Sequence, residues 1–233
     1  MFEYDNRLLA AAAVKPRVIG EVIGILEKID GICVDQDGLK WFNSLYLRIT
    51  QRVSPGKYQD PAWLMALDVR FAQFYLDALA GWLSHGEVAE CWRVLLARRE
   101  QGRIARVQFA LAGVNAHINH DLCAAIVATC EATGTTPQHG GMHYQDYTAL
   151  NTILSAQVDA AKQELMVRLL GDALPPVSHL EETLASWSVT AAREKAWLNA
   201  QYLWHLPALR GTLLKAIDGF TAVIGKTLLV PVP

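Results

Sequence analysis

Apolar residues recur at spacings of three and four along almost the whole chain, and no segment keeps up an alternation of apolar and polar residues. Spacings of three and four place side chains on one face of an α-helix, whereas a half-buried strand requires alternation. The pattern predicts seven helical stretches, at residues 18–29, 39–53, 63–83, 88–97, 104–128, 147–170 and 191–224. The sequence therefore predicts an all-α fold.

Turn-forming residues fall between these stretches, as at Asp30-Gly31, Gly140-Gly141 and Pro175-Pro176, and no segment has the composition of a linker. We therefore expect residues 1–233 to form a single domain, a bundle of about seven or eight helices around a buried central helix at about 104–130. The hydrophobic fraction of 52% is high for 233 residues. It predicts several fully buried helices or the interface of a homo-oligomer.

Charge and composition argue against several classes of partner. The 21 basic and 23 acidic residues are mixed along the chain and give a net charge of -2, so no basic stripe is available for nucleic acid. The longest uncharged run, residues 107–120, is shorter than the ~20 apolar residues of a membrane span. We expect neither nucleic acid nor a membrane as a partner. No phosphate-binding glycine motif occurs, so no nucleotide cofactor is expected.

The cysteines and the start of the chain indicate the compartment. The first residues lack the positively charged stretch of a secretory signal. Cys33, Cys91, Cys123 and Cys130 have no C-x-x-C spacing, so we expect buried, reduced thiols. Both observations favour the cytoplasm.

The predicted central helix carries the densest group of reactive side chains. At roughly 100° per residue, His117, His120 and Asp121 project from one face. Gly113 lies beside them and is too small to crowd them, so this face should form the wall of a polar pocket. Asn115 and Asn119 are expected close together on the opposite side. Polar groups on a helix that is otherwise apolar should be satisfied inside the fold.

This spacing suits two kinds of chemistry. His117 with Asp121, or His117 with His120, can hold one divalent metal ion, and imidazole with carboxylate suits zinc, iron or manganese. Without a metal, His117 or His120 would be a general acid or base tuned by Asp121. A purely structural alternative is that His117 and Asp121 hydrogen-bond to each other and to a neighbouring helix.

Other helices offer side chains that would complete the site. Asp68 shares a core-facing stripe with Tyr75, so this carboxylate needs a partner inside. That partner is a histidine or metal of the histidine helix, the end of a neighbouring helix that Asp68 caps, or Arg193. Asp68 is a candidate catalytic residue. His143 is a candidate metal ligand, and Asp146, three residues later, is either a substrate-binding residue or a first-turn acid favoured by the helix dipole. The further candidates for substrate binding are Tyr75, Asn43 and Arg193. The loop at 132–143 is either a lid or a connection.

Five short motifs carry a resemblance to a known family. They are Asn115-Ala116-His117-Ile118-Asn119-His120-Asp121-Leu122, Trp41-Phe42-Asn43-x-Leu45-Tyr46, Asp68-Val69-x-Phe71-Ala72-x-x-Tyr75, Asp146-Tyr147-x-x-x-Asn151-x-Ile153-Leu154 and Ala192-Arg193-x-x-Ala196-Trp197. Together they resemble a family of uncharacterised bacterial and fungal proteins with a domain of unknown function. The resemblance covers most of the chain and implies no particular activity.

Two classes of function follow from these residues. The first is an enzyme that acts on a small, largely apolar molecule at the His/Asp site between helices, by hydrolysis or oxidation if a metal is bound. The second is a non-catalytic helical module that binds a ligand or another copy of itself. In the second class the polar cluster only fixes how the helices align.

Overall fold

The computed structural model describes residues 2–52, 58–151, 154–156 and 188–231, and no strand occurs in these ranges. The all-α prediction is therefore confirmed. The helices are α1 (Asp5–Ala12), α2 (Ile19–Ile32), α3 (Gly38–Arg52), α4 (Pro61–Leu83), α5 (Glu90–Leu96), α6 (Arg106–Ala116), η1 (His117–Asp121), α7 (Leu122–Thr133), α10 (Val189–His205), η2 (Pro207–Leu209) and α11 (Arg210–Leu228). Residues 142–151 are also helical.

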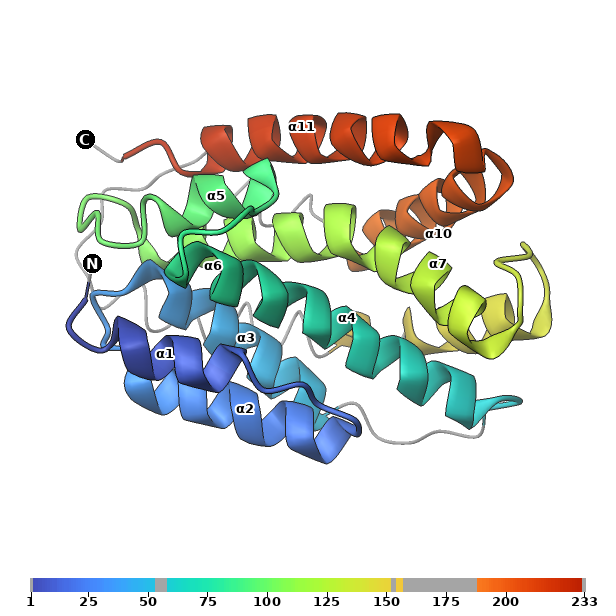
Figure 1. The fold of residues 1–233 in the computed structure, drawn as a ribbon, viewed down its shortest axis with the longest axis horizontal. Coiled ribbons are helices and arrows are strands. Elements are labelled where there is room, and N and C mark those ends of the chain that lie inside the picture. Colours follow the sequence, from blue (N-terminus) through green and yellow to red (C-terminus); the bar gives the residue numbers. More distant parts are fainter. Residues whose placement is uncertain (1, 53–57, 152–153, 157–187, 232–233) are drawn as a thin grey trace.

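The predicted central helix is confirmed. Helix α6, the turn η1 and helix α7 follow one another without a break and cross the middle of the molecule (Figure 1). Helices α3 and α11 pack on α6, while α4 and α10 pack on α7. Every residue of α6 after Arg106 is buried, because neighbours cover the helix on all sides. This helix is therefore enclosed by the rest of the fold.

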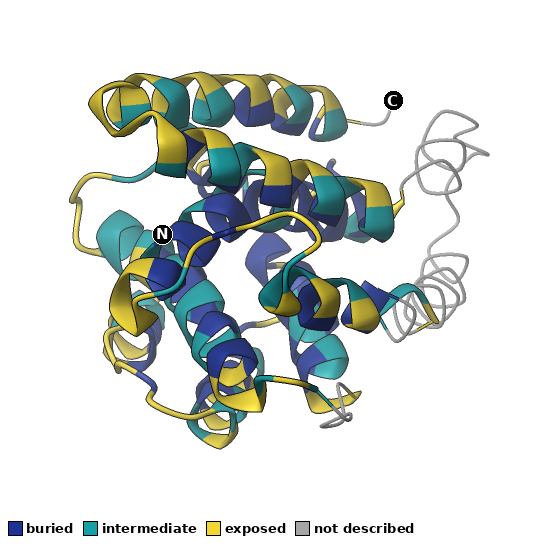
Figure 2. Cartoon of the chain, turned by 90° about the vertical axis from the view of Figure 1, so that its right-hand side faces the viewer, coloured by how far each residue is buried: buried dark blue, intermediate teal, exposed yellow. Residues whose placement is uncertain are grey.

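Two hydrophobic cores lie along the central helix. The first core surrounds α6 and includes Leu26, Leu39, Phe42, Leu76, Leu95 and Phe109. The second core surrounds α7 and includes Trp63, Leu67, Ile126, Tyr147, Trp197 and Leu203. Ile118, inside η1, packs against both. Figure 2 shows buried residues mainly where the helices face one another and exposed residues mainly on their outer sides. The two cores therefore meet at η1.

The last predicted helix differs from the structure. The pattern at 191–224 predicts one helix, but α10 ends at His205 and α11 begins at Arg210. Pro207 lacks an N–H donor and restricts the residue before it, so Leu206 takes a non-helical conformation with φ -119 and ψ 59. Helix α1 has no counterpart among the predicted stretches. The second half of the predicted helix at 147–170 lies outside the described residues.

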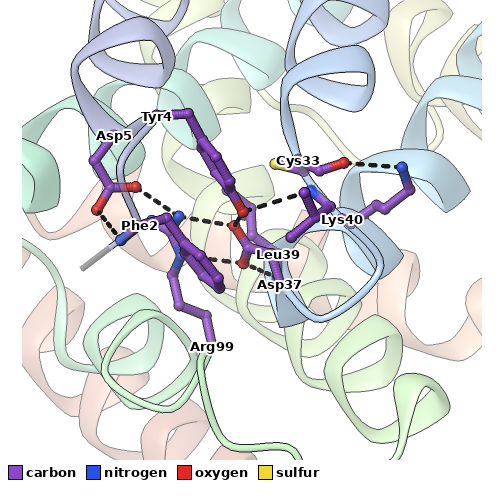
Figure 3. Close-up of polar contacts among 9 residues, drawn as sticks. Phe2, Tyr4, Asp5, Cys33, Asp37, Leu39, Lys40 and Arg99 are labelled. Atoms are coloured by element: carbon purple, nitrogen blue, oxygen red, sulfur yellow. Dashed lines mark hydrogen bonds and ion pairs between the residues drawn. The ribbon is translucent and has the colours of Figure 1, made fainter.

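A buried ionic network fixes the N-terminal part of the fold (Figure 3). The Arg99 guanidinium donates to both oxygens of Asp37, at 3.0 and 2.7 Å, and to Asp5 at 2.7 Å. The Asp37 carboxylate also accepts from the Tyr4 hydroxyl at 3.1 Å and from the Leu39 amide at 2.9 Å. This network joins α1, the start of α3 and the segment after α5. Every group in it has a partner, so it belongs to the architecture.

Candidate functional site

The motif at 117–121 forms a π-helical turn inside the central helix. The amide of Leu122 donates to the carbonyl of His117, five residues earlier, instead of four. Such wide turns are rare and occur frequently at functional sites. The uniform α-helix that we predicted through these residues is therefore wrong at this turn. The unusual backbone coincides with the His and Asp side chains.

Asp121 is the centre of the site. Its carboxylate is 1% exposed and accepts three hydrogen bonds. His117 Nδ1 lies 3.0 Å from Oδ2, His120 Nδ1 lies 2.8 Å from Oδ1, and Trp92 Nε1 of α5 donates to Oδ2 at 2.9 Å. Consecutive residues on an α-helix do not face each other, so the contact between His120 and Asp121 is a feature of this wide turn. One carboxylate thus orients two imidazoles.

The ring of His117 is enclosed by aromatic side chains. It stacks on Phe71 of α4 with 3.6 Å between ring centroids and 6° between planes, and Tyr46 of α3 lies edge-on at 4.7 Å. Phe42, Tyr75 and Trp92 complete the enclosure at 5.7, 6.2 and 6.2 Å. Nε2 of His117 is buried and has no hydrogen-bond partner among the described residues. A buried polar atom without a partner is rare and requires an explanation.

The charge states of the three groups follow from their contacts. Burial lowers the pKa of His117 more than the Asp121 carboxylate raises it, so this imidazole is neutral at pH 7. Burial alone would raise the pKa of Asp121, but the hydrogen bonds from both histidines bring that pKa below its usual range. An ionised carboxylate only accepts, so the proton of neutral His117 is on Nδ1. Its Nε2 therefore carries a free lone pair.

His120 differs from His117 in its electrostatics. Burial lowers its pKa, but the hydrogen bond and the charge of Asp121, together with the charge of Asp218 on α11, outweigh burial and raise that pKa overall. The carboxylates that face His120 therefore favour its charged form. The two imidazoles on Asp121 are not equivalent.

Asp68 lies on α4, three residues before Phe71, which stacks on His117. It is part-buried, and within the described ranges its carboxylate makes no hydrogen bond or ion pair. Burial raises the pKa of Asp68 to about 6, although the charge of Arg193 lowers it. Burial, followed by the charges of Asp68 and Asp121, also raises the pKa of Tyr46. The charges of Asp68 and Asp121 therefore both act on the Tyr46 hydroxyl.

The structure gives the other candidates different surroundings. Tyr75 lines the enclosure of His117 and donates its hydroxyl to Asn43 at 3.2 Å. Asn43 in turn donates to the carbonyl of Leu26 at 2.9 Å, so its amide joins α2 to α3. Arg193 donates to Asn151 at 2.7 Å and to the Tyr147 carbonyl at 2.8 Å. Arg193 therefore has partners of its own and does not depend on Asp68.

His143 and Asp146 belong to the helix at 142–151 and contact the residues at the start of α4. The Asp146 carboxylate accepts from the amides of Gln59 and Asp60 at 2.9 and 2.7 Å. His143 Nε2 is 3.1 Å from Asp60, and its ring lies against Trp63. Trp63 precedes Phe71 by eight residues on α4, which places His143 roughly 12 Å along the helix from His117. The structure does not bring these two residues to the histidine site.

Three further expectations can be compared with the structure. The space beside Gly113 is filled, because a Cβ there would lie 2.3 Å from the Phe42 ring, so an open pocket wall was the wrong expectation for this position. The loop at 132–143 is tied to α4, where Trp63 donates to Thr135 at 3.2 Å. Asn119 donates to Asn115 at 3.0 Å, and this confirms the predicted pairing on the opposite face.

Sequence reasoning missed the contributions of α5 and α11. Trp92, which donates to Asp121, follows Cys91 in a short helix that the pattern marks only as apolar. Asp218 accepts from the amides of Glu90 and Cys91, both at 2.8 Å. No spacing in the sequence links residues 91 and 218, so these contacts become visible only in the fold. All four cysteines are buried and free, as predicted.

Comparison with known proteins identifies the family alone. No curated protein and no solved structure matches the chain. One family model, described as a family of unknown function, matches residues 19–231 and so includes every candidate residue discussed above. The chain belongs to this family of unknown function, DUF5995.

Proposed function

We propose that this protein is an enzyme in which His117, held by Asp121, transfers a proton on a small, largely apolar molecule bound between α3, α4 and η1. The observation that carries the proposal is the unpartnered, buried Nε2 of His117. Its other ring nitrogen donates to a carboxylate at 3.0 Å, which fixes the tautomer and the ring orientation. A neutral imidazole oriented in this way is a general base.

The proposed proton transfer uses both partners. Nε2 takes a proton from the substrate or from a water molecule, and His117 becomes a cation in a surrounding of low polarity. The Asp121 carboxylate then stabilises that cation, in the way a buried aspartate supports the histidine of a hydrolase triad. Trp92 and His120 keep the carboxylate in place through two further hydrogen bonds.

The surroundings of Nε2 indicate the substrate class. The enclosure is made of the rings of Phe42, Tyr46, Phe71, Tyr75 and Trp92. An uncharged molecule with apolar or aromatic parts suits such walls, whereas a strongly charged one would lose its hydration without compensation.

Asp68 supplies a second group for acid-base chemistry. Its pKa of about 6 lies near neutral pH, where a carboxyl group both gives and takes protons readily. Its charge acts on the Tyr46 hydroxyl, and the Tyr46 ring lies edge-on to the His117 ring at 4.7 Å. We therefore propose Asp68 as the second acid-base group, which gives a proton to the substrate while His117 takes one, and both groups then exchange protons with water.

A metal held jointly by His117 and Asp121 does not fit this arrangement. The Asp121 oxygens already accept three N–H groups, and His117 points its Nδ1 at Asp121 itself. Joint coordination would break bonds that are buried on all sides. The four free cysteines suit a reducing compartment, so we propose that the reaction takes place in the cytoplasm.

The test combines spectroscopy with kinetics. In protein labelled with 15N at histidine, we expect His117 at pH 7 to carry its proton on Nδ1. Uncharged esters and ketones with ring substituents are then tested with the parent, His117→Gln and His139→Gln. The His139 ring lies against Tyr144 with 4.3 Å between ring centroids, away from the site, so its variant is the matched control. We expect the rate to fall about 10²- to 10⁴-fold in His117→Gln alone. A rate that survives His117→Gln would refute the proposal.

A second candidate function, self-association, is supported by a different part of the surface. Helices α10 and α11 expose Leu198, Tyr202, Phe220 and Val223 at 48%, 52%, 56% and 61%. Lys195 of α10 lies over the Phe220 ring of α11 at 4.6 Å, so these two helices lie side by side. Sedimentation equilibrium of the parent and of Val223→Lys tests this candidate. A parent that stays monomeric at high concentration would exclude it.

A further inference from the structure

Three side chains of metal-binding type converge on the side of η1 that faces α5 and α11. Cys91 comes from α5, His120 from η1 and Asp218 from α11, and each offers one ligand atom within 4.8 Å of the others. Cys91 is buried, while His120 and Asp218 are part-buried. The three residues are far apart in the sequence, so only the packing of the three elements brings them together.

Neighbouring groups orient two of these side chains. His120 directs Nδ1 to the Asp121 carboxylate at 2.8 Å, which leaves Nε2 as its ligand atom. Asp218 accepts the amides of Glu90 and Cys91, and a carboxylate with about four lone-pair positions keeps some free for a metal. Metal-binding histidines in proteins almost always donate their second nitrogen to a carboxylate or carbonyl. Asp121 fills that role for His120.

The chemistry of the donors selects the ion. Thiolate, imidazole and carboxylate together suit zinc, which binds them at about 2.3, 2.0 and 2.1 Å in a tetrahedron. Ligand atoms of a tetrahedron with these bond lengths lie roughly 3.5 Å apart, so the side chains need to close by about 1 Å. Thiolate and carboxylate carry two negative charges, which balance Zn²⁺. Three protein ligands leave the fourth position open, as in catalytic zinc sites.

We propose that Cys91, His120 and Asp218 form a binding site for one zinc ion with an open fourth position. The proposal does not depend on proton transfer by His117. The two sites share only Asp121, which contacts His117 through Oδ2 and His120 through Oδ1. Asp121 is therefore a positioning residue for the metal site.

Cobalt(II) is the probe for this site, because a thiolate bound to Co²⁺ gives a charge-transfer absorption in the near ultraviolet. Full-length protein without a histidine tag is freed of metal with a chelator and titrated with CoCl₂. We expect the absorption to saturate at one equivalent and to disappear when Zn²⁺ is added. Its absence from the parent would overturn the proposal, whatever the variants show.

Variants locate the ligands. Cys91→Ser should abolish the charge-transfer absorption. Cys33→Ser should leave it unchanged because Cys33 is not one of the proposed ligands. Cys33 is the matched control, since it is also buried and also lies near a carboxylate, that of Asp37. Asp121→Asn should weaken zinc binding about 10- to 100-fold through its effect on His120. His117→Gln should bind as the parent does, which separates this proposal from the function of His117. An absorption that persists in folded Cys91→Ser would overturn it.

Asp218→Asn provides an independent test in case the Cys91 variant does not fold. It keeps an oxygen that accepts from the start of α5 but removes the negative charge. We expect at least a tenfold loss of zinc affinity with an unchanged circular dichroism spectrum. Unchanged zinc affinity in this variant would also count against the site.

Discussion

Replacing Asp68 by Asn should stabilise the protein at neutral pH. The Asp68 carboxylate is part-buried, and among the described residues it forms no hydrogen bond or ion pair. Burial raises its pKa from 3.8 to about 6. One pKa unit corresponds to about 1.36 kcal/mol, so ionised Asp68 destabilises the folded state by up to about 3 kcal/mol. Asn keeps the shape of the neutral carboxyl group and avoids this loss.

The pH dependence has a definite sign. The unfolded chain loses the Asp68 proton near pH 3.8, but the folded chain keeps it until about pH 6. Between these values the folded state binds more protons, so the contribution of Asp68 to stability falls as pH rises. Above pH 6 the loss is complete. The advantage of Asp68→Asn should therefore be near zero at pH 3.5, grow through pH 4–6 and stay constant from pH 7.

The free energy of unfolding of both proteins is measured from pH 3.5 to 8 by urea denaturation, with circular dichroism as the readout. Subtracting one free energy from the other at each pH removes the effect of the titrating groups that both proteins share. The competing explanation is that Asp68 stabilises the fold by pairing with Arg193. In that case Asp68→Asn would be less stable than the parent at pH 7. That result would refute our account, in which Arg193 is already paired with Asn151 and the Tyr147 carbonyl and not with Asp68.

Three further predictions concern other parts of the chain. Gly113→Ala should destabilise the fold by about 1–3 kcal/mol in urea, since its Cβ would meet the Phe42 ring, and no change would show that α6 and α3 can separate. Arg99→Ala should cost about 3–5 kcal/mol by the same assay, because it leaves Asp37 buried and unpaired, and a loss below 1 kcal/mol would contradict the network of Figure 3. Zinc affinity, followed by competition with a chelator, should rise with pH, since burial, together with the charges of Asp121 and Asp218, raises the pKa of Cys91 and the thiol must lose its proton to bind. An affinity independent of pH would argue against a thiolate ligand.

The residues of the site were predictable where local spacing determines the contact. His117 and Asp121, four residues apart, do meet, and so do Asn115 and Asn119. Both pairs depend on one helix and its periodicity. Asp68 was expected on a core-facing stripe, and its burial is reflected in its raised pKa.

Contacts between distant segments were not predictable in this way. Asp146 accepts the amides before α4, and Asp218 accepts those at the start of α5, although either residue could have served its own helix. Which helix start an acid reaches depends on how whole helices pack. The π-helical turn was not predictable either, because its residues fit an ordinary α-helix equally well.

The wide turn at 117–121 has a geometric consequence for the two cores. An i→i+5 turn contains about one residue more than an α-helical turn, so everything after Asp121 is rotated by about 100° relative to an unbroken helix. Helix α6 packs in the first core and α7 in the second. The one extra residue in the turn therefore determines how the buried face of α7 is rotated relative to that of α6. If the same residues formed a regular α-helix there, Ile126 would turn away from Trp197 by more than a quarter of a revolution.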